Sequence, residues 1–119
     1  MNKKSLIIIL LIFITITGSS CGVLRKPLDK SVLLSKHMYD TLEHIREEDW
    51  QQSLESLTTV EKAWKRIKPV LQIDIDHDYI NEMEDRISVL KAYIEVQDKS
   101  NALATIFSMR NIWESIGQM

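Results

Sequence analysis

Residues 49–67 read DWQQSLESLTTVEKAWKRI, and their apolar side chains recur at the spacing of one helix face. The side chains on this face are Leu54, Leu57, Val60 or Glu61, Trp64 and Ile67. Asp49 stands before the first turn with Gln52 three residues later, which is the arrangement of a capping box. The stretch therefore predicts an amphipathic helix that begins just after Asp49.

The end of this helix is predicted at Pro69, or a kink there, because proline has no backbone N–H to donate. Positive charge gathers just before this proline, at Lys62, Lys65, Arg66 and Lys68. Cations in the last turns of a helix interact favourably with its dipole. The sequence thus assigns these four residues a structural role at a helix C-terminus.

The same design returns in residues 98–116, DKSNALATIFSMRNIWESI. Asp98 takes the place of Asp49, and Trp113 takes the place of Trp64. The shared apolar pattern alone does not require the turn aspartate or the late tryptophan, so these two matches are additional evidence that the two stretches are similar. Gly117 follows, as expected just past a helix end. The two stretches predict equivalent helices in two similar halves of the chain.

A further helix is predicted before each of these two stretches. Residues 29–48 have one apolar stripe, and residues from Asp78 to about Gln97 have another: Leu34, Met38, Leu42, Ile45; Ile80, Met83, Ile87, Leu90, Ile94. Each pair reads as a helix hairpin, over about 29–68 and about 76–117. We therefore expect an all-α fold, either a four-helix bundle or two stacked antiparallel hairpins.

Composition bounds the function. The chain has 119 residues, enough for one small domain, and its net charge of −2 predicts no basic surface for nucleic acid. One cysteine excludes a disulfide framework within one chain, and only 3 glycines leave no Gly-rich phosphate loop. No HExxH or Gly-x-Ser-x-Gly motif occurs. We expect a protein that is not an enzyme and that needs no cofactor.

The N-terminus has the order of a bacterial secretory signal. Lys3 and Lys4 precede the uncharged run LIIILLIFITIT at 6–17, and small residues then lead to Cys21. A cysteine at this place resembles the lipidation site of a lipoprotein signal. We expect residues 1–20 to be a signal peptide or membrane anchor and residues 21–28 to be the lipidated cysteine with a spacer.

An uncleaved membrane anchor is the other interpretation. Residues 5–24 carry no charge and reach the roughly 20 residues that a membrane span needs. Both interpretations tether the helical domain, residues 29–117, to a membrane. Its expected location is extracytoplasmic, in the cell envelope.

An acidic segment between the hairpins is the candidate ligand site. Its potential ligands are Asp74, Asp76, His77, Asp78 and Glu82. Carboxylates at alternate positions are typical of a calcium loop, and imidazole with carboxylate suits zinc or another transition metal. Tyr79 stands where a calcium loop needs glycine for its sharp turn. The competing interpretation is a capping cluster at the start of a helix.

Trp50 is the candidate partner contact. It lies in the first turn of its predicted helix, off the Leu54–Leu57 stripe. An exposed tryptophan is a common anchor of protein interfaces. Tryptophans at helical spacing otherwise fill a core.

One family resemblance covers roughly residues 30–117. It rests on these elements: Asp49-Trp50, Leu54, Leu57, Ala63-Trp64, Ile67, Ile75-Asp76-His77, Ile80, Ile87, Leu90-Lys91-Ala92-Tyr93-Ile94, Asp98 and Ala102-Leu103. The chain resembles the bacterial family of domain of unknown function 4363, which implies an N-terminal apolar segment and a short all-helical domain. It departs from the family at Cys21 and at Pro69-Val70. The resemblance implies no activity.

These observations lead to two functional hypotheses. The first is a membrane-tethered, non-catalytic interaction module whose partner is another envelope protein or a second copy of itself. The second is a metal- or small-ligand-binding lipoprotein that uses the His77 region. An exposed apolar patch on the packed domain favours the first. A pocket of carboxylates and imidazole at 74–85 favours the second.

Overall fold

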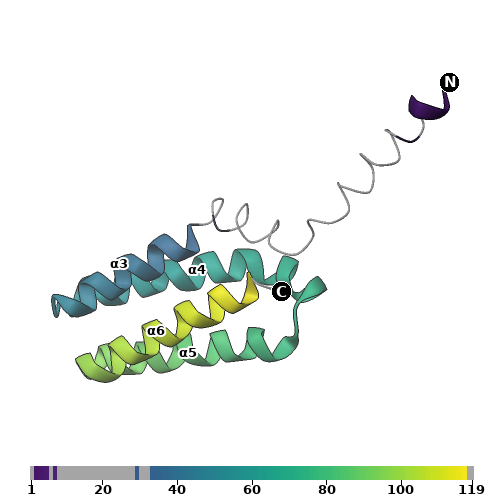
Figure 1. The fold of residues 1–119 in the computed structure, drawn as a ribbon. Coiled ribbons are helices and arrows are strands. Elements are labelled where there is room, and N and C mark those ends of the chain that lie inside the picture. The colour runs from purple at the N-terminus through teal and green to yellow at the C-terminus, as the bar shows by residue number, and fades with distance from the viewer. Residues whose placement is uncertain (1, 6, 8–28, 30–32, 118–119) are drawn as a thin grey trace.

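The computed structural model describes residues 2–5, 7, 29 and 33–117. Within them lie four long helices (Figure 1): α3 (Leu34–Arg46), α4 (Trp50–Asp74), α5 (His77–Glu95) and α6 (Lys99–Ile116). The described residues contain no strand, so the predicted all-α class is confirmed. Cys21, the rest of the segment 21–28 and most of residues 1–20 lie outside the described residues. None of the helices that are described has both the length and the apolar character to cross a bilayer.

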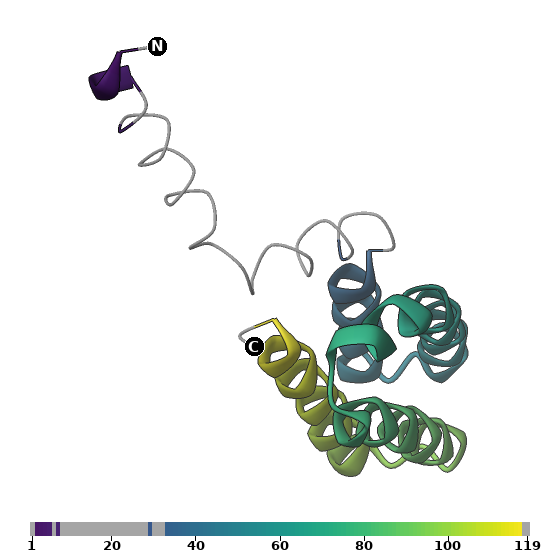
Figure 2. The ribbon, with the colours of Figure 1, turned by 90° about the vertical axis from the view of Figure 1, so that its right-hand side faces the viewer.

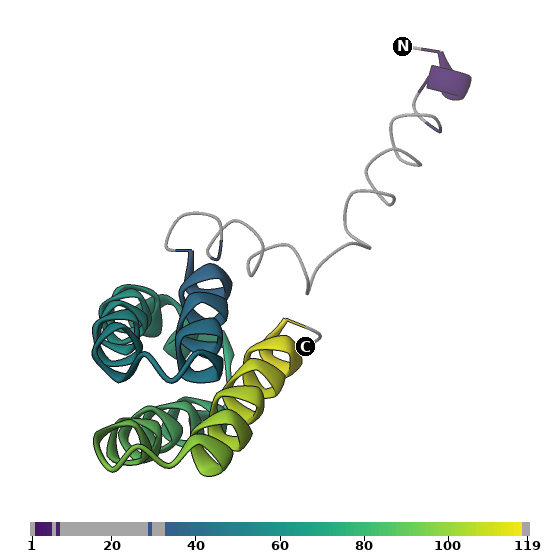
Figure 3. The same ribbon diagram turned by 90° about the vertical axis from the view of Figure 1, so that its left-hand side faces the viewer.

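The four helices form an antiparallel bundle. Each one packs against two others, α3 against α4 and α6, and α5 against α4 and α6. Figures 2 and 3 view the molecule from its two ends and show the helices arranged around a common centre. Of the two arrangements expected from the sequence, the structure has the four-helix bundle.

The up-down order gives the bundle two distinct ends (Figure 1). The turns 46–50 and 95–99 lie at one end, which we call the turn end. The start of α3, the α4–α5 link and the end of α6 lie at the other, which we call the link end. The N-terminal part of the chain therefore joins the bundle at the link end.

The core is built from the predicted stripes. Two equivalent tryptophans, Trp64 and Trp113, are 2% and 1% exposed and are its largest side chains. Aliphatic residues and methionines of all four helices surround them: Leu34, Met38, Leu42, Ile45, Leu57, Val60, Ile67, Ile80, Met83, Ile87, Leu90, Ile94, Ile106, Met109, Ile112 and Ile116. Every helix buries one face, so the bundle depends on all four helices together.

The two predicted turn aspartates act as equivalent helix caps. The Asp49 carboxylate accepts a hydrogen bond from the Gln52 backbone N–H, and the Asp98 carboxylate accepts one from the Asn101 backbone N–H. Both distances are 3.1 Å. Each cap satisfies an N–H that the first helical turn would otherwise leave without a partner.

The backbone of the two turns also matches. Glu48 and Gln97, the residues before the caps, have φ values of 56° and 58° in the left-handed region. Four residues after each aspartate comes a small, fully buried side chain, Ser53 in α4 and Ala102 in α6. These similarities extend the sequence repeat to the geometry of the hairpins.

Of the two predictions for Pro69, a helix end is wrong, because α4 continues to Asp74. The alternative, a kink at Pro69, stays a prediction. Leu71 beyond the proline is 5% exposed and belongs to the core, so its packing holds the last turns in helical form. The dipole interpretation of the cations before Pro69 is also wrong. The true last turn of α4 contains no basic residue.

The first hairpin, predicted to begin at about residue 29, is described at Asp29 and from Leu33 onward. The backbone of Leu33 is left-handed, with φ 56°, and α3 starts at Leu34. The Asp29 carboxylate accepts a hydrogen bond of 2.8 Å from the Ser35 backbone N–H. Asp29 therefore contributes to capping α3 from outside the helix.

Asp98 makes the stability of the bundle sensitive to acid. The Asn101 side-chain amide donates to its carboxylate at 2.7 Å, and this bond, with the Asn101 backbone N–H, lowers the pKa of Asp98. A carboxyl whose pKa is lower in the folded state stabilises the fold above its unfolded pKa, near about 4. This contribution is lost as the pH falls through the folded pKa.

We expect Asp98→Asn to remove this contribution while keeping a good N-cap. Urea unfolding of both proteins between neutral pH and pH values below the ordinary aspartate pKa measures the effect. The difference in stability between the two proteins should be largest at neutral pH and shrink in acid. A difference that stays constant across this range would show that Asp98 does not titrate as inferred.

Candidate functional site

The acidic segment forms the link between α4 and α5. Asp74 is the last residue of α4, and His77 is the first residue of α5. Between them, Asp76 is the N-cap of α5, and its carboxylate accepts a hydrogen bond of 3.2 Å from the Asp78 backbone N–H. Asp78 is the acidic residue of the first turn, where it complements the helix dipole.

All five predicted ligands have exposed side chains: Asp74, Asp76, His77, Asp78 and Glu82. In the part of the chain that the structure describes, no three His, Cys, Asp or Glu side chains form a group that could hold a metal ion. The hydrogen bond of Asp76 fits the competing interpretation, a capping cluster. Metal binding at the link stays a prediction.

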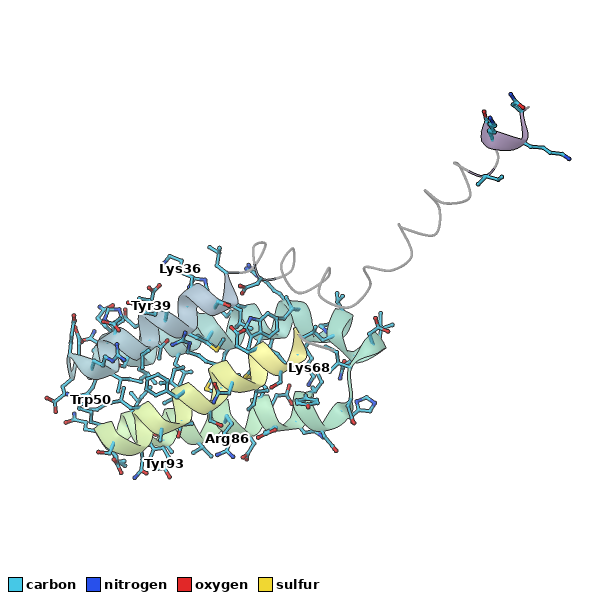
Figure 4. The ribbon with its side chains drawn as sticks, viewed as in Figure 1. Lys36, Tyr39, Trp50, Lys68, Arg86 and Tyr93 are labelled. Carbon is cyan, nitrogen blue, oxygen red and sulfur yellow. The ribbon has the colours of Figure 1, made fainter. Side chains whose placement is uncertain are left out.

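Trp50 is the first residue of α4, at the turn end of the bundle (Figure 4). Its side chain is partly buried and packs against the core. This partial burial fits the interpretation of Trp50 as a core residue, and its role as a partner contact stays a prediction.

Val96 lies with Trp50 at the turn end. It stands in the turn between α5 and α6 and is 71% exposed. Phe107, in the middle of α6, is 41% exposed, and the guanidinium of Arg46 lies 5.9 Å from its ring centroid. Lys99 and Glu48 join the two turns by an ion pair of 3.7 Å. At the turn end, an ion pair therefore joins the two turns, and apolar groups are accessible.

One interhelical ion pair lies toward the link end. The Lys68 ammonium of α4 contacts the Glu84 carboxylate of α5 at 2.5 Å, and both side chains are partly buried. Figure 4 labels Lys68 in the half of the bundle toward the link end. Lys68 therefore faces a neighbouring helix, and this contact accounts for its charge.

Three polar nitrogens are buried without a hydrogen-bond partner among the described residues: His44 Nδ1, Trp64 Nε1 and Arg86 Nε. Sequence reasoning did not single out Arg86. Its place between Met83 and Leu90, three residues after one and four before the other, puts it at the edge of the α5 stripe. That spacing was the available signal for its partial burial.

The family comparison identifies one family. The model of the family described as Domain of unknown function (DUF4363) matches residues 28–119. No curated protein and no solved structure shows a significant match to the chain. The matched residues include all four helices of the bundle.

Proposed function

We propose that this chain, which belongs to the DUF4363 family of unknown function, is a membrane-tethered extracytoplasmic module that acts by binding another protein. Its N-terminal segment is the tether, and its four-helix bundle presents the binding surface. The partner is another protein of the cell envelope or a second copy of the chain. The module carries out no catalysis of its own.

The observation that carries this proposal is the exposed apolar surface at the turn end. Val96 is 71% exposed there, and Trp50 leaves part of its ring accessible at the same end. Exposed apolar groups that gather in one place are typical of interaction sites, and tryptophan is a frequent anchor. The N-terminal part of the chain joins the opposite end, so Val96 and Trp50 lie at the end of the bundle that is far from the attachment of the tether.

Two forms of the tether fit this proposal. In one, residues 1–20 are a signal peptide and Cys21 carries lipid. In the other, the uncharged residues 5–24 stay in the membrane as an anchor. Both forms hold the bundle by its link end.

Photo-crosslinking in intact cells tests the binding surface. A photoreactive amino acid in place of Val96 should give one discrete adduct of higher mass. The matched control carries the same amino acid in place of Ser88, an exposed residue in the middle of α5. Mass spectrometry of the adduct distinguishes a second copy from another protein. The same adducts at both positions, or none at Val96, would contradict the proposal.

A further inference from the structure

The outer face of α4 carries a row of exposed residues that is basic at its start and apolar toward the end of the helix. Toward the link end this row contains Lys62, Lys65, Arg66, Pro69, Val70 and Ile73, which we call the basic-apolar stripe. Their spacing of three and four residues places them on one face of the helix. The stripe runs along about 16 Å of the helix surface.

Neither the fold nor the helix dipole accounts for the three outward cations. Lys62, Lys65 and Arg66 lie at least two turns before the true end of α4 at Asp74. No carboxylate of the described residues forms a salt bridge with any of them. This contrasts with Lys68, whose charge is matched by Glu84 across the interface with α5.

The apolar part of the stripe is equally unexplained by the core. Ile73 is 85% exposed and Val70 is 44% exposed, although Leu71 between them is buried. Transfer of an isoleucine side chain from water to an apolar phase is favourable. Ile73 therefore offers an anchor to any apolar phase that the stripe can reach.

We propose that the basic-apolar stripe docks on the surface of the anionic membrane to which the chain is tethered. Helices that lie in a membrane interface combine basic side chains with apolar ones that enter the acyl boundary. In the stripe, the three cations would meet lipid headgroups, and Ile73 and Val70 would enter the apolar layer. The inference rests on the tether of the proposed function and extends it by assigning the membrane-facing side of the bundle.

The position of the stripe suits this occupant. It ends at the link end of the bundle, which is also the end that joins the N-terminal part of the chain. In both forms of the tether, at least residues 25–32 lie between the membrane and α3, and they can span up to about 26 Å when extended. That exceeds the spacing of packed helix axes, about 8–10 Å, between α3 and its neighbour α4. The tether therefore allows α4 to lie along the membrane.

The charges nearby limit how the bundle can lie. Asp74 follows Ile73 by one residue, so it points about 100° around the helix, away from the centre of the stripe. The exposed carboxylates of α5 include Asp78, Glu82 and Asp85, and these must stay in water. The docked bundle therefore rests on α4 alone.

A second copy of the chain is a poorer occupant. The acidic outer face of α5 complements the cations of the stripe. However, α5 exposes no large apolar side chain to receive Ile73, while a lipid surface supplies both charge and an apolar phase. The observations thus favour lipid.

Depth-dependent fluorescence quenching tests the proposal on the full chain. An environment-sensitive fluorescent amino acid replaces Ile73, and the protein is reconstituted in vesicles of phosphatidylethanolamine with and without phosphatidylglycerol. Quenching by lipids brominated on their acyl chains reports entry into the apolar layer. The matched control carries the same fluorophore in place of Val96, which is similarly exposed at the turn end.

We expect strong quenching at position 73 in the anionic vesicles and little at position 96. The triple variant Lys62→Gln, Lys65→Gln, Arg66→Gln should lower the ratio of docked to undocked protein by roughly 100-fold, since each cation near an anionic surface contributes roughly 5-fold. Equal quenching at the two positions would overturn the proposal. So would a signal at position 73 that depends on protein density and not on phosphatidylglycerol, because it would indicate a second copy.

Flotation of the same samples separates the two proposals. Protein that fails to float with the vesicles would contradict the tether and with it the proposed function. Protein that floats but shows no quenching at position 73 would contradict the docked stripe alone.

Discussion

Replacement of Trp113 by alanine is expected to destabilise the folded chain by about 3–5 kcal/mol. The Trp113 ring is 1% exposed and lies in the shared core of the bundle. Its Nε1 also donates a hydrogen bond of 3.1 Å to the Ser35 hydroxyl of α3. The loss is large beside the total stability of a small domain, about 5–15 kcal/mol. Urea unfolding followed by circular dichroism measures it.

A comparison with Trp64 separates the hydrogen bond from the packing. Trp64 occupies the equivalent place in α4, but its buried Nε1 has no partner among the described residues. The residue equivalent to Ser35 is Glu84, whose carboxylate contacts Lys68. Trp113→Phe therefore breaks a hydrogen bond, whereas Trp64→Phe removes a donor that is buried without a partner.

We expect Trp64→Phe to be less destabilising than Trp113→Phe by about 1–3 kcal/mol, the cost of burying an unpaired donor. Both substitutions replace a tryptophan by a phenylalanine in the same core, so the loss of ring size is the same in the two variants. Equal losses of stability in the two variants would mean that the two indole N–H groups have equivalent surroundings, contrary to the structure.

Pro69→Ala is expected to stabilise the chain, by up to about 3 kcal/mol. Pro69 is exposed and lies inside α4, where it removes one backbone hydrogen bond of the helix. Alanine restores the N–H donor and has the highest helix propensity. Thermal unfolding and far-ultraviolet circular dichroism should show a higher Tm with unchanged or slightly increased helix content.

Glu55→Ala is the matched control. Glu55 is also exposed on α4, but its replacement by alanine removes no proline. An exposed substitution of this kind should change the stability by no more than about 0.5 kcal/mol. If Pro69→Ala behaved like this control, Pro69 would not lie inside α4, contrary to the structure.

Local signals made most of the bundle predictable. Asp49 and Asp98 mark helix starts because a carboxylate before the first turn satisfies free N–H groups there. The apolar stripes identify the buried faces, including both core tryptophans. The helix end predicted at Pro69 rests on a local rule, the missing N–H of proline. The structure continues the helix because Leu71 packs in the core against residues distant in the sequence. The choice between a bundle and stacked hairpins also depends on long-range contacts that periodicity does not encode.

The candidate surfaces were less predictable, for a physical reason. Ile73 and Val96 lie off the buried apolar stripes, near helix ends, and only the assembled bundle shows that they stay largely exposed. The pattern of Lys62, Lys65 and Arg66 predicts a helix end near them, whereas α4 ends at Asp74. By contrast, the capping role of Asp76 was one of the two interpretations that its sequence supported.

The tether is the central claim, and fractionation of bacterial cells that produce the full chain tests it most directly. The account predicts that the protein sediments with the membranes, resists extraction by high salt and is released by detergent. It also predicts that a variant without residues 1–21 is recovered in the soluble fraction while keeping its helical circular dichroism spectrum. Full-length protein found in the soluble fraction would contradict the account.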